Sequence, residues 1–588
     1  MKKIFSSLLI IVYLMGCNNK TQNLESNKEL STTLEKYYEE RLQLFPLEAT
    51  ANGDNRYNDK LYIDFTESYR NKLKEFYTTY ANEIDKYKSD ELNENDKISY
   101  DVFKREMQMS LKALTFKDNL TPLNQFWGLH LTLGQLGSGD GNQPFKTVED
   151  YDNWIKRATV FSLWVDSAIA YFKIGMNENY VLPKSLAVKI IPQCKGIVVD
   201  DVTKSLFWGP IKKLPSTFSD TDKKRITDDY TKLIGEQILP SYKKLGDFFE
   251  KEYLAKTRTT SGINGVATGI DYYKYLIEYW TTTNKTPDEI YTTGLAEVKR
   301  IREEMERVKT EVKFNGDLKA FFEFMKTDKQ FMPYTTPDEV LNAFRSIQKN
   351  IDINLSSMFG TTPKTKFEIR QTEAFRAASA SAEYNQGSAD GTRPGIFYVP
   401  IIDATKFNTT SGMESLFLHE AIPGHHYQIS LQQENESLPK FRRFSWYGAY
   451  GEGWALYCES LGKDLGLYTD PYQYMGALGD EIHRAIRLVV DVAIHTKNMS
   501  REEAIKYMMD NEAISEEGAT AEIERYMAIP AQALSYKTGA LKIKELRDKF
   551  NKTQGDKFSL KNFHDEFLKD GCLPLDVLER KMEVWSKH

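Results

Sequence analysis

The sequence predicts a mainly α-helical protein with a small β element, and three features support this fold class. Apolar residues recur at spacings of three and four in Leu34 to Leu44, Tyr151 to Phe172 and Tyr272 to Trp280, which places them on one face of a helix. Several helix starts are explicit, and the 19 prolines leave most of the chain free to form helices. No linker rich in proline, glycine or serine divides the chain after Thr32, so we expect one large helical body.

The first residues resemble an export signal. Met1-Lys2-Lys3 precedes a mostly apolar run from Ile4 to Leu14, which is too short to span a bilayer. Leu14-Met15-Gly16-Cys17 resembles a bacterial lipobox, in which a signal peptidase cuts before the cysteine and the thiol carries diacylglyceryl. We therefore predict a signal peptide in residues 1–16, lipidation of Cys17 and a polar tether in residues 17–31. The lipid would anchor the body, residues 32–588, to a membrane of the bacterial cell envelope.

The charge distribution argues against a nucleic-acid partner, and the cysteine spacing argues against a disulfide framework. Charged residues make up 28% of the chain with a net charge of −6 and no basic stripe, so nucleic acid is not an expected partner. The cysteines that remain after Cys17 lack any CxxC spacing and do not form a disulfide framework: Cys194, Cys458 and Cys572. The sequence carries no signal for an oligomeric state.

Three helix starts carry the capping-box pattern. Each offers a hydroxyl at the cap and a glutamate three residues later, which together satisfy free backbone N–H groups. Two of them also have proline at the first helical position, where its missing N–H costs nothing. The pairs are Thr286 with Glu289, Thr336 with Glu339, and Ser500 with Glu503.

The main non-helical region runs from Lys364 to Pro400. Phe367 and Ile369 alternate with polar residues, and the apolar run from Gly395 to Val399 ends at Pro400. A glycine-containing loop separates the two stretches. We predict a small β element here, immediately before the histidine-rich segment that follows.

Three of the eight histidines fall within the eight residues from His419 to His426. A catalytic zinc site needs two neutral imidazoles, a third protein ligand and one open position for water. In the HExxH helix, a glutamate beside the first histidine acts as the general base, and Glu420 occupies that place here. Pro423 stands where the second histidine usually lies, so the candidates for the second ligand are His425 and His426.

Helix geometry separates the two candidates. In an unbroken helix His425 would point about 240° away from His419, and His426 would lie roughly 10 Å along the axis, too far for two ligands about 2 Å from zinc. Pro423 and Gly424 allow two residues to bulge out of the turn. Such a bulge makes His425 the second ligand and leaves His426 beside the site or facing the substrate.

A third ligand is expected from the segment Gly451 to Glu459. Glu452 and Glu459 are seven residues apart and lie on one face of a helix. We expect Glu452, nearer the preceding loop, to bind the metal and Glu459 to accept the N–H of a ligating imidazole. The alternative is that both are ordinary helix carboxylates.

These motifs together resemble those of bacterial domain-of-unknown-function family 885. The resemblance covers most of the mature chain and is carried by HEAIPGHH, EGWALYCE, Arg487 to His495, Arg525-Tyr526, Pro530 to Gly539, Phe45-Pro46 and Arg393-Pro394-Gly395. It implies zinc peptidases that are distantly similar to the thimet-oligopeptidase and thermostable-carboxypeptidase groups. It also implies a helical body with a deep channel, and we place the catalytic region at about residues 364–540.

The predicted ligands and Glu420 together predict a mechanism for peptide hydrolysis. Zn²⁺ held by His419, His425 and Glu452 would activate a water, and Glu420 would carry its proton to the leaving amine of a peptide substrate. The oxyanion needs a hydrogen-bond donor, and the candidates are Tyr536, Tyr526 and His495. Tyr536 is preferred by analogy with the late tyrosine of oligopeptidases, although most of the 34 tyrosines are packing residues.

Further residues are candidates to bind substrate. The resemblance implies that the strand ending at Tyr398 lies along the active-site edge and pairs with the substrate backbone. Arg393, Arg487 and Arg525 could each bind a C-terminal carboxylate bidentately, which would make the enzyme a carboxypeptidase. A plain structural strand and ordinary salt bridges are the alternatives.

Three functions remain compatible with the sequence. The first is a lipid-anchored zinc peptidase acting on oligopeptides at the cell envelope. The second is a zinc hydrolase of another amide, such as cell-wall peptide, and the third is a lipoprotein that binds peptide or metal without catalysis. Glu420 argues against the third, because metal binding alone does not require a general base.

Overall fold

The computed structural model describes residues 25–372, 381–388, 391, 393–410 and 412–587. The expected signal peptide and Cys17 lie outside these residues. Helix α1 (Lys28–Leu44) begins four residues before Thr32, where we had expected the folded body to begin. The Asn27 side chain caps this helix, and its backbone N–H donates to Asp96 at 2.6 Å, so part of the expected tether is folded.

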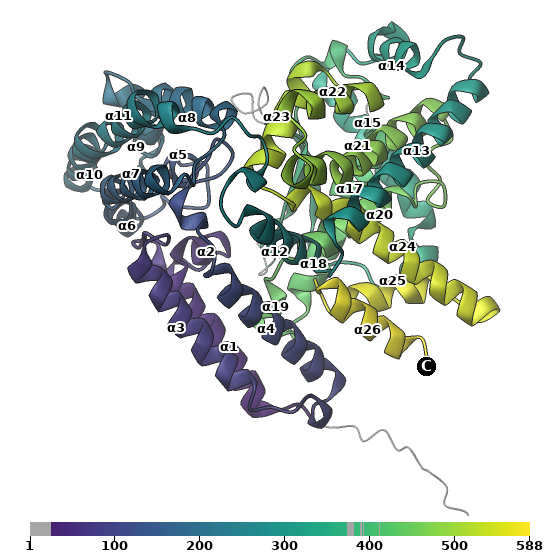
Figure 1. Ribbon diagram of the computed structural model, residues 1–588, viewed down its shortest axis with the longest axis horizontal. Coiled ribbons are helices and arrows are strands. Elements are labelled where there is room, and N and C mark those ends of the chain that lie inside the picture. The colour runs from purple at the N-terminus through teal and green to yellow at the C-terminus, as the bar shows by residue number, and fades with distance from the viewer. Residues whose placement is uncertain (1–24, 373–380, 389–390, 392, 411, 588) are drawn as a thin grey trace, which may run out of the picture.

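The first four helices form a layer at the lower left of Figure 1. They are α1, α2 (Pro46–Ala51), α3 (Glu67–Ile84) and α4 (Glu94–Ala113). Tyr37 packs edge-on against Phe103, with ring centres 4.7 Å apart. The core around them continues into the C-terminal helices, where Phe441 lies 5.4 Å from Phe103.

The next helices form a cluster with a hydrophobic core of its own, at the upper left of Figure 1. They are α5 (Leu129–Gly137), α6 (Val148–Thr159), α7 (Phe161–Glu178), α8 (Lys184–Ile197), α9 (Gly209–Lys212), α10 (Asp220–Leu233) and α11 (Leu239–Phe248). The segment Tyr151 to Phe172, which the sequence indicated as one helical stretch, is two helices separated at Val160.

The capping predictions are confirmed. Thr286, Thr336 and Ser500 each form a complete capping box, at the starts of α13 (Pro287–Glu311), α15 (Pro337–Met358) and α22 (Arg501–Asn511). Around them lie α12 (Gly269–Thr281), α14 (Leu318–Thr327), α21 (Pro471–Thr496) and α23 (Glu516–Ala528).

The predicted β element is a three-stranded sheet. It consists of β1 (Phe367–Gln371), β2 (Glu383–Asn385) and β3 (Gly395–Val399), in the order β1-β3-β2. β3 pairs with β1 in parallel and with β2 antiparallel, so both of its edges are occupied. The expectation that the strand ending at Tyr398 pairs with substrate is therefore wrong, because the edge strands are β1 and β2.

The remaining helices carry the histidine-rich segment and the C-terminus. They are α17 (Met413–Glu420), α18 (His425–Glu434), α19 (Lys440–Arg443), α20 (Gly448–Glu459), α24 (Ser535–Gln554), α25 (Leu560–Leu568) and α26 (Leu575–Trp585). α20 and α24 cross closely at Gly453 and Gly539, where a Cβ on Gly539 would lie 1.8 Å from the Ala449 carbonyl oxygen. Only glycine permits this approach, which brings the helix of Glu452 against the helix of Tyr536.

The fold class is confirmed as mainly α. Among the described helices, none combines the length and apolar character needed to cross a membrane. The three described cysteines are buried and free, in agreement with the absence of a disulfide pattern.

A channel runs between the N-terminal layer and the rest of the molecule. It encloses about 750 Å³ and is lined by residues of α1, α3, α4 and α12, and by the segment from Phe441 to Tyr447. At one side it reaches Trp446, whose ring centre is 5.7 Å from that of His425. Trp446 therefore connects the lining of this channel to the histidine-rich segment.

Candidate metal centre

The helix that begins before His419 breaks instead of bulging. α17 ends at Glu420, Ala421 has the non-helical dihedrals φ −108° and ψ −102°, and α18 begins at His425. Pro423 follows a cis peptide bond and has no N–H for a helical hydrogen bond. A Cβ on Gly424 would lie 1.9 Å from the carbonyl oxygen of His419, so the chain folds back over the end of α17 only because residue 424 is glycine.

A side chain from another helix supports the break. Nε1 of Trp454, on α20, donates a hydrogen bond of 2.8 Å to the Pro423 carbonyl, and both groups are buried. The consequence is the one expected from a bulge: His425, and not His426, lies beside His419. The ring centres of His419 and His425 are 4.9 Å apart and perpendicular.

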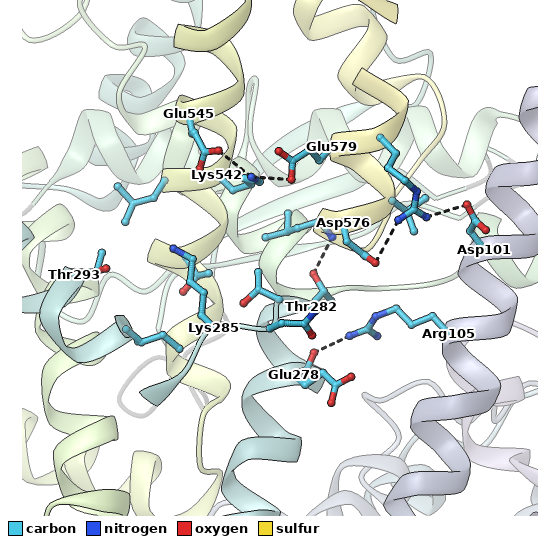
Figure 2. A pocket seen from close by; sticks show the side chains of 18 of the residues that line it. Asp101, Arg105, Glu278, Thr282, Lys285, Thr293, Lys542, Glu545, Asp576 and Glu579 are labelled. Atoms are coloured by element: carbon cyan, nitrogen blue, oxygen red, sulfur yellow. Dashed lines mark hydrogen bonds and ion pairs between the residues drawn. The ribbon is translucent and has the colours of Figure 1, made fainter. Parts of the chain in front are cut away.

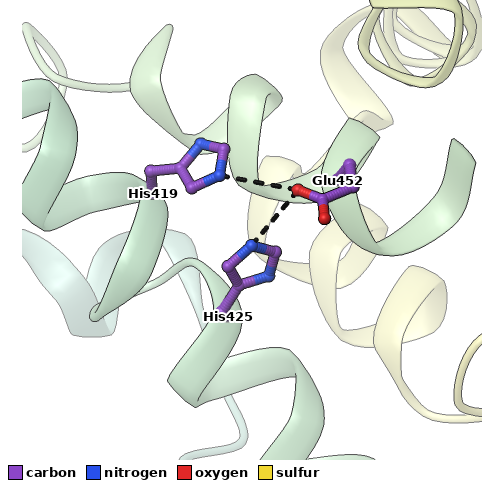
Figure 3. Close-up of side chains that lie close together, drawn as sticks. All are labelled: His419, His425 and Glu452. Atoms are coloured by element: carbon purple, nitrogen blue, oxygen red, sulfur yellow. Dashed lines mark ion pairs between the residues drawn. The ribbon is translucent and has the colours of Figure 1, made fainter. Parts of the chain in front are cut away.

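Glu452 completes a cluster with these two histidines. Its Oε2 lies 3.7 Å from Nε2 of His419 and 3.4 Å from Nε2 of His425 (Figure 3). Suitable ligand atoms of the three residues all lie within 4.8 Å of one another. The sequence analysis proposed the same three residues as ligands.

The arrangement fits a zinc ion. Ligand atoms about 2.0–2.2 Å from a tetrahedral zinc are about 3.3–3.6 Å from one another, close to the two distances to Glu452. Two imidazoles and one carboxylate are also the protein ligands of one class of catalytic zinc site, which keeps its fourth position open.

The electrostatics of the cluster favour a cation. Burial would lower the pKa of His419, but its hydrogen bonds with Glu452 and Glu459 raise that pKa to about 10. Burial likewise opposes ionisation of Glu452, yet His425 and His419 hold its pKa below the ordinary range. A largely buried site whose carboxylate Glu452 stays ionised attracts positive charge.

Glu459 lies where the sequence analysis expected it. Its Oε1 is 2.7 Å from Nδ1 of His419, so it accepts the N–H of the ring nitrogen that faces away from Glu452. Nδ1 of His425 is buried and has no such partner among the described residues.

Glu420 faces the sheet. Its Oε2 accepts a hydrogen bond of 2.9 Å from the backbone N–H of Tyr384, in the edge strand β2. The same strand holds His426, because the Tyr384 hydroxyl lies 3.0 Å from Nδ1 of His426. His426 is buried beside Phe367, and burial lowers its pKa to about 4. His426 therefore supports the sheet side of the site and does not join the cluster.

The three oxyanion candidates lie in different surroundings. Tyr536 is half-buried on α24, one turn before the close crossing at Gly539, with its ring centre 4.7 Å from the guanidinium of Arg487. Tyr526 is buried, and its hydroxyl donates to Glu522 at 2.6 Å while accepting from Nε of Arg487 at 2.9 Å. The hydroxyl of Tyr526 is therefore engaged by the protein, whereas no hydrogen bond of the Tyr536 hydroxyl is found among the described residues, and Tyr536 remains the predicted oxyanion donor.

His495 cannot serve as an oxyanion donor in this structure. It is fully buried, its Nδ1 accepts from the Ile263 N–H at 2.9 Å, and its Nε2 lies 3.1 Å from the Tyr526 carbonyl. The first contact makes Nδ1 the unprotonated nitrogen, so the single N–H of the neutral ring points to Tyr526. Burial lowers the pKa of His495 to about 3, which keeps the ring neutral. We withdraw this residue as a catalytic candidate.

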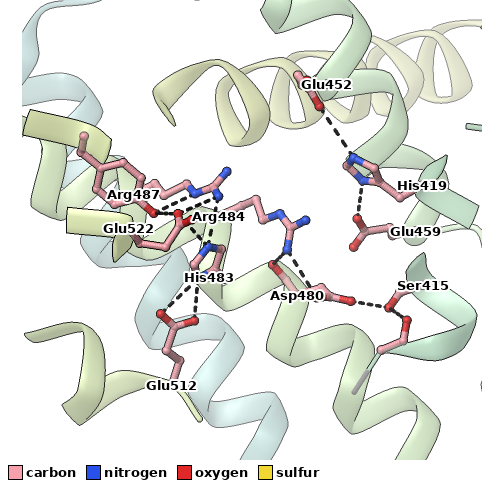
Figure 4. Close-up of polar contacts among 12 residues, drawn as sticks. Ser415, His419, Glu452, Glu459, Asp480, His483, Arg484, Arg487, Glu512 and Glu522 are labelled. Carbon is pink, nitrogen blue, oxygen red and sulfur yellow. Dashed lines mark hydrogen bonds and ion pairs between the residues drawn. The ribbon is translucent and has the colours of Figure 1, made fainter. Parts of the chain in front are cut away.

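Two of the three arginine candidates are engaged by other residues. Arg487 forms an ion pair of 3.0 Å with Glu522 inside a buried network (Figure 4), and Arg525 lies 3.6 Å from the same carboxylate. We withdraw these two as binders of a substrate carboxylate. Arg393 is exposed and donates to the Gln386 carbonyl at 3.3 Å, so its role in binding substrate stays a prediction.

Fold and site together define a class: mainly helical bacterial proteins with a buried His-His-Glu cluster beside a channel. The chain belongs to the family described as bacterial protein of unknown function (DUF885), whose model matches residues 46–582. The comparison with curated proteins gave no match.

Two solved structures are similar over almost the whole chain. One is a protein from Colwellia psychrerythraea assigned as a lipoprotein, with 27% identity and a TM-score of 0.88, covering 96% of this chain and 100% of that one. The other, from Shewanella oneidensis, is assigned as a lipoprotein of unknown function. Its 19% identity and TM-score of 0.74, over 94% of this chain and 99% of that one, show a shared fold.

Some residues of the site were not found from the sequence. Tyr384 lies in a strand of three residues that carries no alternation, so nothing in the sequence indicated its contacts. Trp446 and Trp454 offered a weak signal, since Trp446 precedes the Glu452 motif, Trp454 lies within it, and tryptophan is rare, with eight in the chain.

Proposed function

We propose that this protein is a zinc-dependent peptidase whose metal is held by His419, His425 and Glu452. The observation that carries the proposal is the geometry of this cluster: two buried histidines and a partly buried glutamate, with the spacing of tetrahedral zinc ligands, next to a channel of about 750 Å³. Zinc bound there would lower the pKa of a water and polarise a peptide carbonyl.

The chain's own residues supply the remaining chemistry. Glu420 follows the first ligand directly and is half-buried, so it can take a proton from water and return it to the leaving amine. Glu459 orients His419 through the 2.7 Å hydrogen bond. Tyr536 is the proposed hydrogen-bond donor to the oxyanion, because its hydroxyl has no protein partner among the described contacts and its helix crosses that of Glu452.

The test compares variants of the soluble form that begins after Cys17. Zinc content is measured per protein, and a mixed peptide library is assayed by mass spectrometry. Wild type is expected to hold about one zinc and to cleave peptides. Glu420→Gln should keep zinc and lose activity, His425→Ala should lose both, and His426→Asn should keep its zinc.

Other results would remove the proposal. Equal zinc content in all four proteins would show that His425 is not a ligand. If the zinc-loaded wild type cleaves no peptide in the library but hydrolyses cell-wall fragments, the protein is a zinc hydrolase of cell-wall peptide. If it hydrolyses neither, a binding protein without catalysis is favoured.

We also propose that the protein is attached to a membrane of the cell envelope by lipid on Cys17. The sequence Leu14-Met15-Gly16-Cys17 and the two structural neighbours assigned as lipoproteins support this. Cys17→Ala should move the protein from the membrane fraction to the soluble fraction, and an unchanged membrane fraction would contradict the anchor.

A further inference from the structure

The channel contains four arginines, and three of them are fully engaged by the protein. Arg41 pairs with Glu48 at 2.9 Å, and Arg70 pairs with Asp118 at 3.1 Å. Arg258 donates to backbone carbonyls, among them that of Val181 at 2.9 Å. In Arg41 and Arg70 the positive charge is paired with a carboxylate, and in Arg258 the N–H donors bind carbonyl groups of the wall.

Arg105, on α4, differs from them. Its Nη2 donates to the Glu278 carbonyl at 2.7 Å, in the last turn of α12 (Figure 2). No described carboxylate lies within ion-pair distance of its guanidinium. A guanidinium carries several N–H donors in a planar fork, so one hydrogen bond to a carbonyl leaves most of them available.

The unpaired charge of Arg105 lies at the boundary between two cavities. The residue lies in the wall between the channel and a second cavity of about 570 Å³, which Figure 2 shows. In that cavity Lys542 pairs with Glu579 at 2.9 Å and Arg580 pairs with Asp101 at 2.9 Å. Lys542 and Arg580 are thus balanced, whereas Arg105 has no described carboxylate partner; Lys285 lines the same cavity without a described ion pair but is exposed to solvent.

Arg105 lines the same channel as Trp446 and Tyr447, in the segment that leads to the metal cluster. Burial raises the pKa of the Tyr447 hydroxyl, Glu106 raises it further, and the nearby charge of Arg105 opposes both. Tyr447 directly follows Trp446, whose ring lies beside His425. A peptide that extends from the metal cluster past Trp446 would therefore meet the α4 wall at Arg105.

The lining of the channel suits peptide side chains. Fourteen of its forty lining residues are aromatic, compared with 13% of the whole chain, which favours apolar side chains along most of its length. An anionic group in such a channel needs a specific partner, because burying an unpaired charge is costly.

We propose that Arg105 binds a carboxylate of the peptide substrate, so that the enzyme prefers peptides with a free C-terminal carboxylate or an acidic side chain at the position that reaches α4. The proposal rests on the peptidase function proposed above. Arginine and carboxylate form a bidentate pair, which fixes both the position and the orientation of the bound chain end.

The test uses two pairs of apolar peptides with the zinc-loaded protein. One pair differs only in a free C-terminal acid or amide, and the other, with amidated ends, carries glutamate or glutamine at one internal position in turn. Values of kcat/KM are compared for wild type, Arg105→Gln, Arg105→Lys and Lys104→Gln. Lys104→Gln removes one positive charge from the same helix outside the channel and serves as the matched control. Binding of the same peptides to Glu420→Gln, with and without Arg105→Gln, is measured separately.

Wild type should prefer the carboxylate member of one pair by about tenfold to a hundredfold, the value of one charged hydrogen-bonded contact. Arg105→Gln should lose this preference and retain its rate on the amide, Arg105→Lys should keep part of it, and Lys104→Gln should match wild type. The pair that shows the effect identifies the source of the carboxylate.

Two results would overturn the inference: equal rates on both members of both pairs in wild type, or an unchanged preference in Arg105→Gln. If wild type cleaves nothing, the peptidase function fails, and the binding measurements still decide the role of Arg105. Binding that depends on the carboxylate and on Arg105 would support that role, and binding indifferent to either would exclude it.

Discussion

Oε1 of Glu459 lies 2.7 Å from Nδ1 of His419, and this hydrogen bond fixes which ring nitrogen faces Glu452. Both residues are buried, and Glu459 is further surrounded by the network around Arg484 and Asp480 (Figure 4). A carboxylate in this position makes the imidazole a stronger ligand, because it stabilises positive charge on the ring.

Glu459→Gln is therefore expected to weaken zinc binding by about 10- to 100-fold. The amide oxygen can still accept the hydrogen bond, so the loss reports the charge and not the position of the ring. Zinc affinity is measured by competition with a chelator. Glu414→Gln is the matched control, since Glu414 lies on α17, the helix of His419, and its carboxylate accepts the Tyr468 N–H at 2.7 Å. Equal affinity in both variants would contradict the role of Glu459.

Gly424→Ala is expected to remove zinc binding and to lower the free energy of unfolding by about 3 kcal/mol or more. The added Cβ would lie 1.9 Å from the His419 carbonyl oxygen and 2.3 Å from that of Leu418, and backbone atoms cannot yield to it as a flexible side chain could. Zinc content and thermal denaturation measure the two effects.

Gly479→Ala provides the control for this substitution. Gly479 lies within α21, and a Cβ there would meet nothing within 4 Å. It should keep zinc and gain about 0.5–1 kcal/mol of stability, as expected for alanine in a helix. A Gly424→Ala protein with normal zinc content would show that the break between α17 and α18 does not position His425.

Local patterns allowed much of this fold to be predicted, because the interactions that determine them lie within a few residues. The capping box at Thr286 needs only Glu289 three residues later, while β1 shows in the alternation of apolar and polar residues and β3 in a short apolar run. The ligand set was also predictable, since the spacing of His419 and His425 admits few arrangements that bind one ion.

The errors involve contacts between residues far apart in sequence. The break after Glu420 depends on Trp454 from α20, whereas the two-residue bulge was inferred from the local sequence alone. Arg487 is engaged by Glu522, and His495 accepts from the Ile263 N–H. Neither partner lies at a spacing in the sequence that would have predicted the contact. The channel arginine, Arg105, carried no motif at all.

Removal of metal is expected to lower the thermal denaturation midpoint. An ion that binds only the folded protein stabilises it by about 2.7 kcal/mol at a free concentration 100 times its Kd. Dialysis against a chelator should therefore lower the midpoint of wild type, and added zinc should restore it. Glu420→Gln should show the same shift, whereas His425→Ala should show none. A shift of equal size in His425→Ala would mean that the stabilising ion binds elsewhere.

Asp491 provides a prediction for pH dependence away from the metal cluster. It is fully buried on α21, accepts from the Tyr273 hydroxyl at 2.6 Å, and lies 3.1 Å from the Ala531 N–H. Burial raises its pKa from 3.8 to about 7, against the opposing effects of Tyr273, Ala531 and Arg487. Between about pH 4 and pH 7 the folded protein thus holds a proton that the unfolded chain has released. Each pH unit of increase in this range removes about 1.4 kcal/mol of stability.

Asp491→Asn should abolish this dependence, because asparagine is neutral at every pH in the range. Tyr273 and Ala531 both donate to Oδ1, which the amide oxygen can replace, but the amide NH2 would then stand in place of Oδ2, 3.2 Å from the Ala531 N–H. Two donors would face each other there, so the variant is expected to be less stable than wild type at pH 5. The difference in denaturation midpoint should then shift in favour of the variant by several degrees as the pH is raised to 7.5. Asp271→Asn, at an exposed position on α12, should show a constant difference from wild type. If the difference for Asp491→Asn is equally constant, the buried carboxyl group does not hold its proton in the folded protein, and the pH dependence must come from other groups.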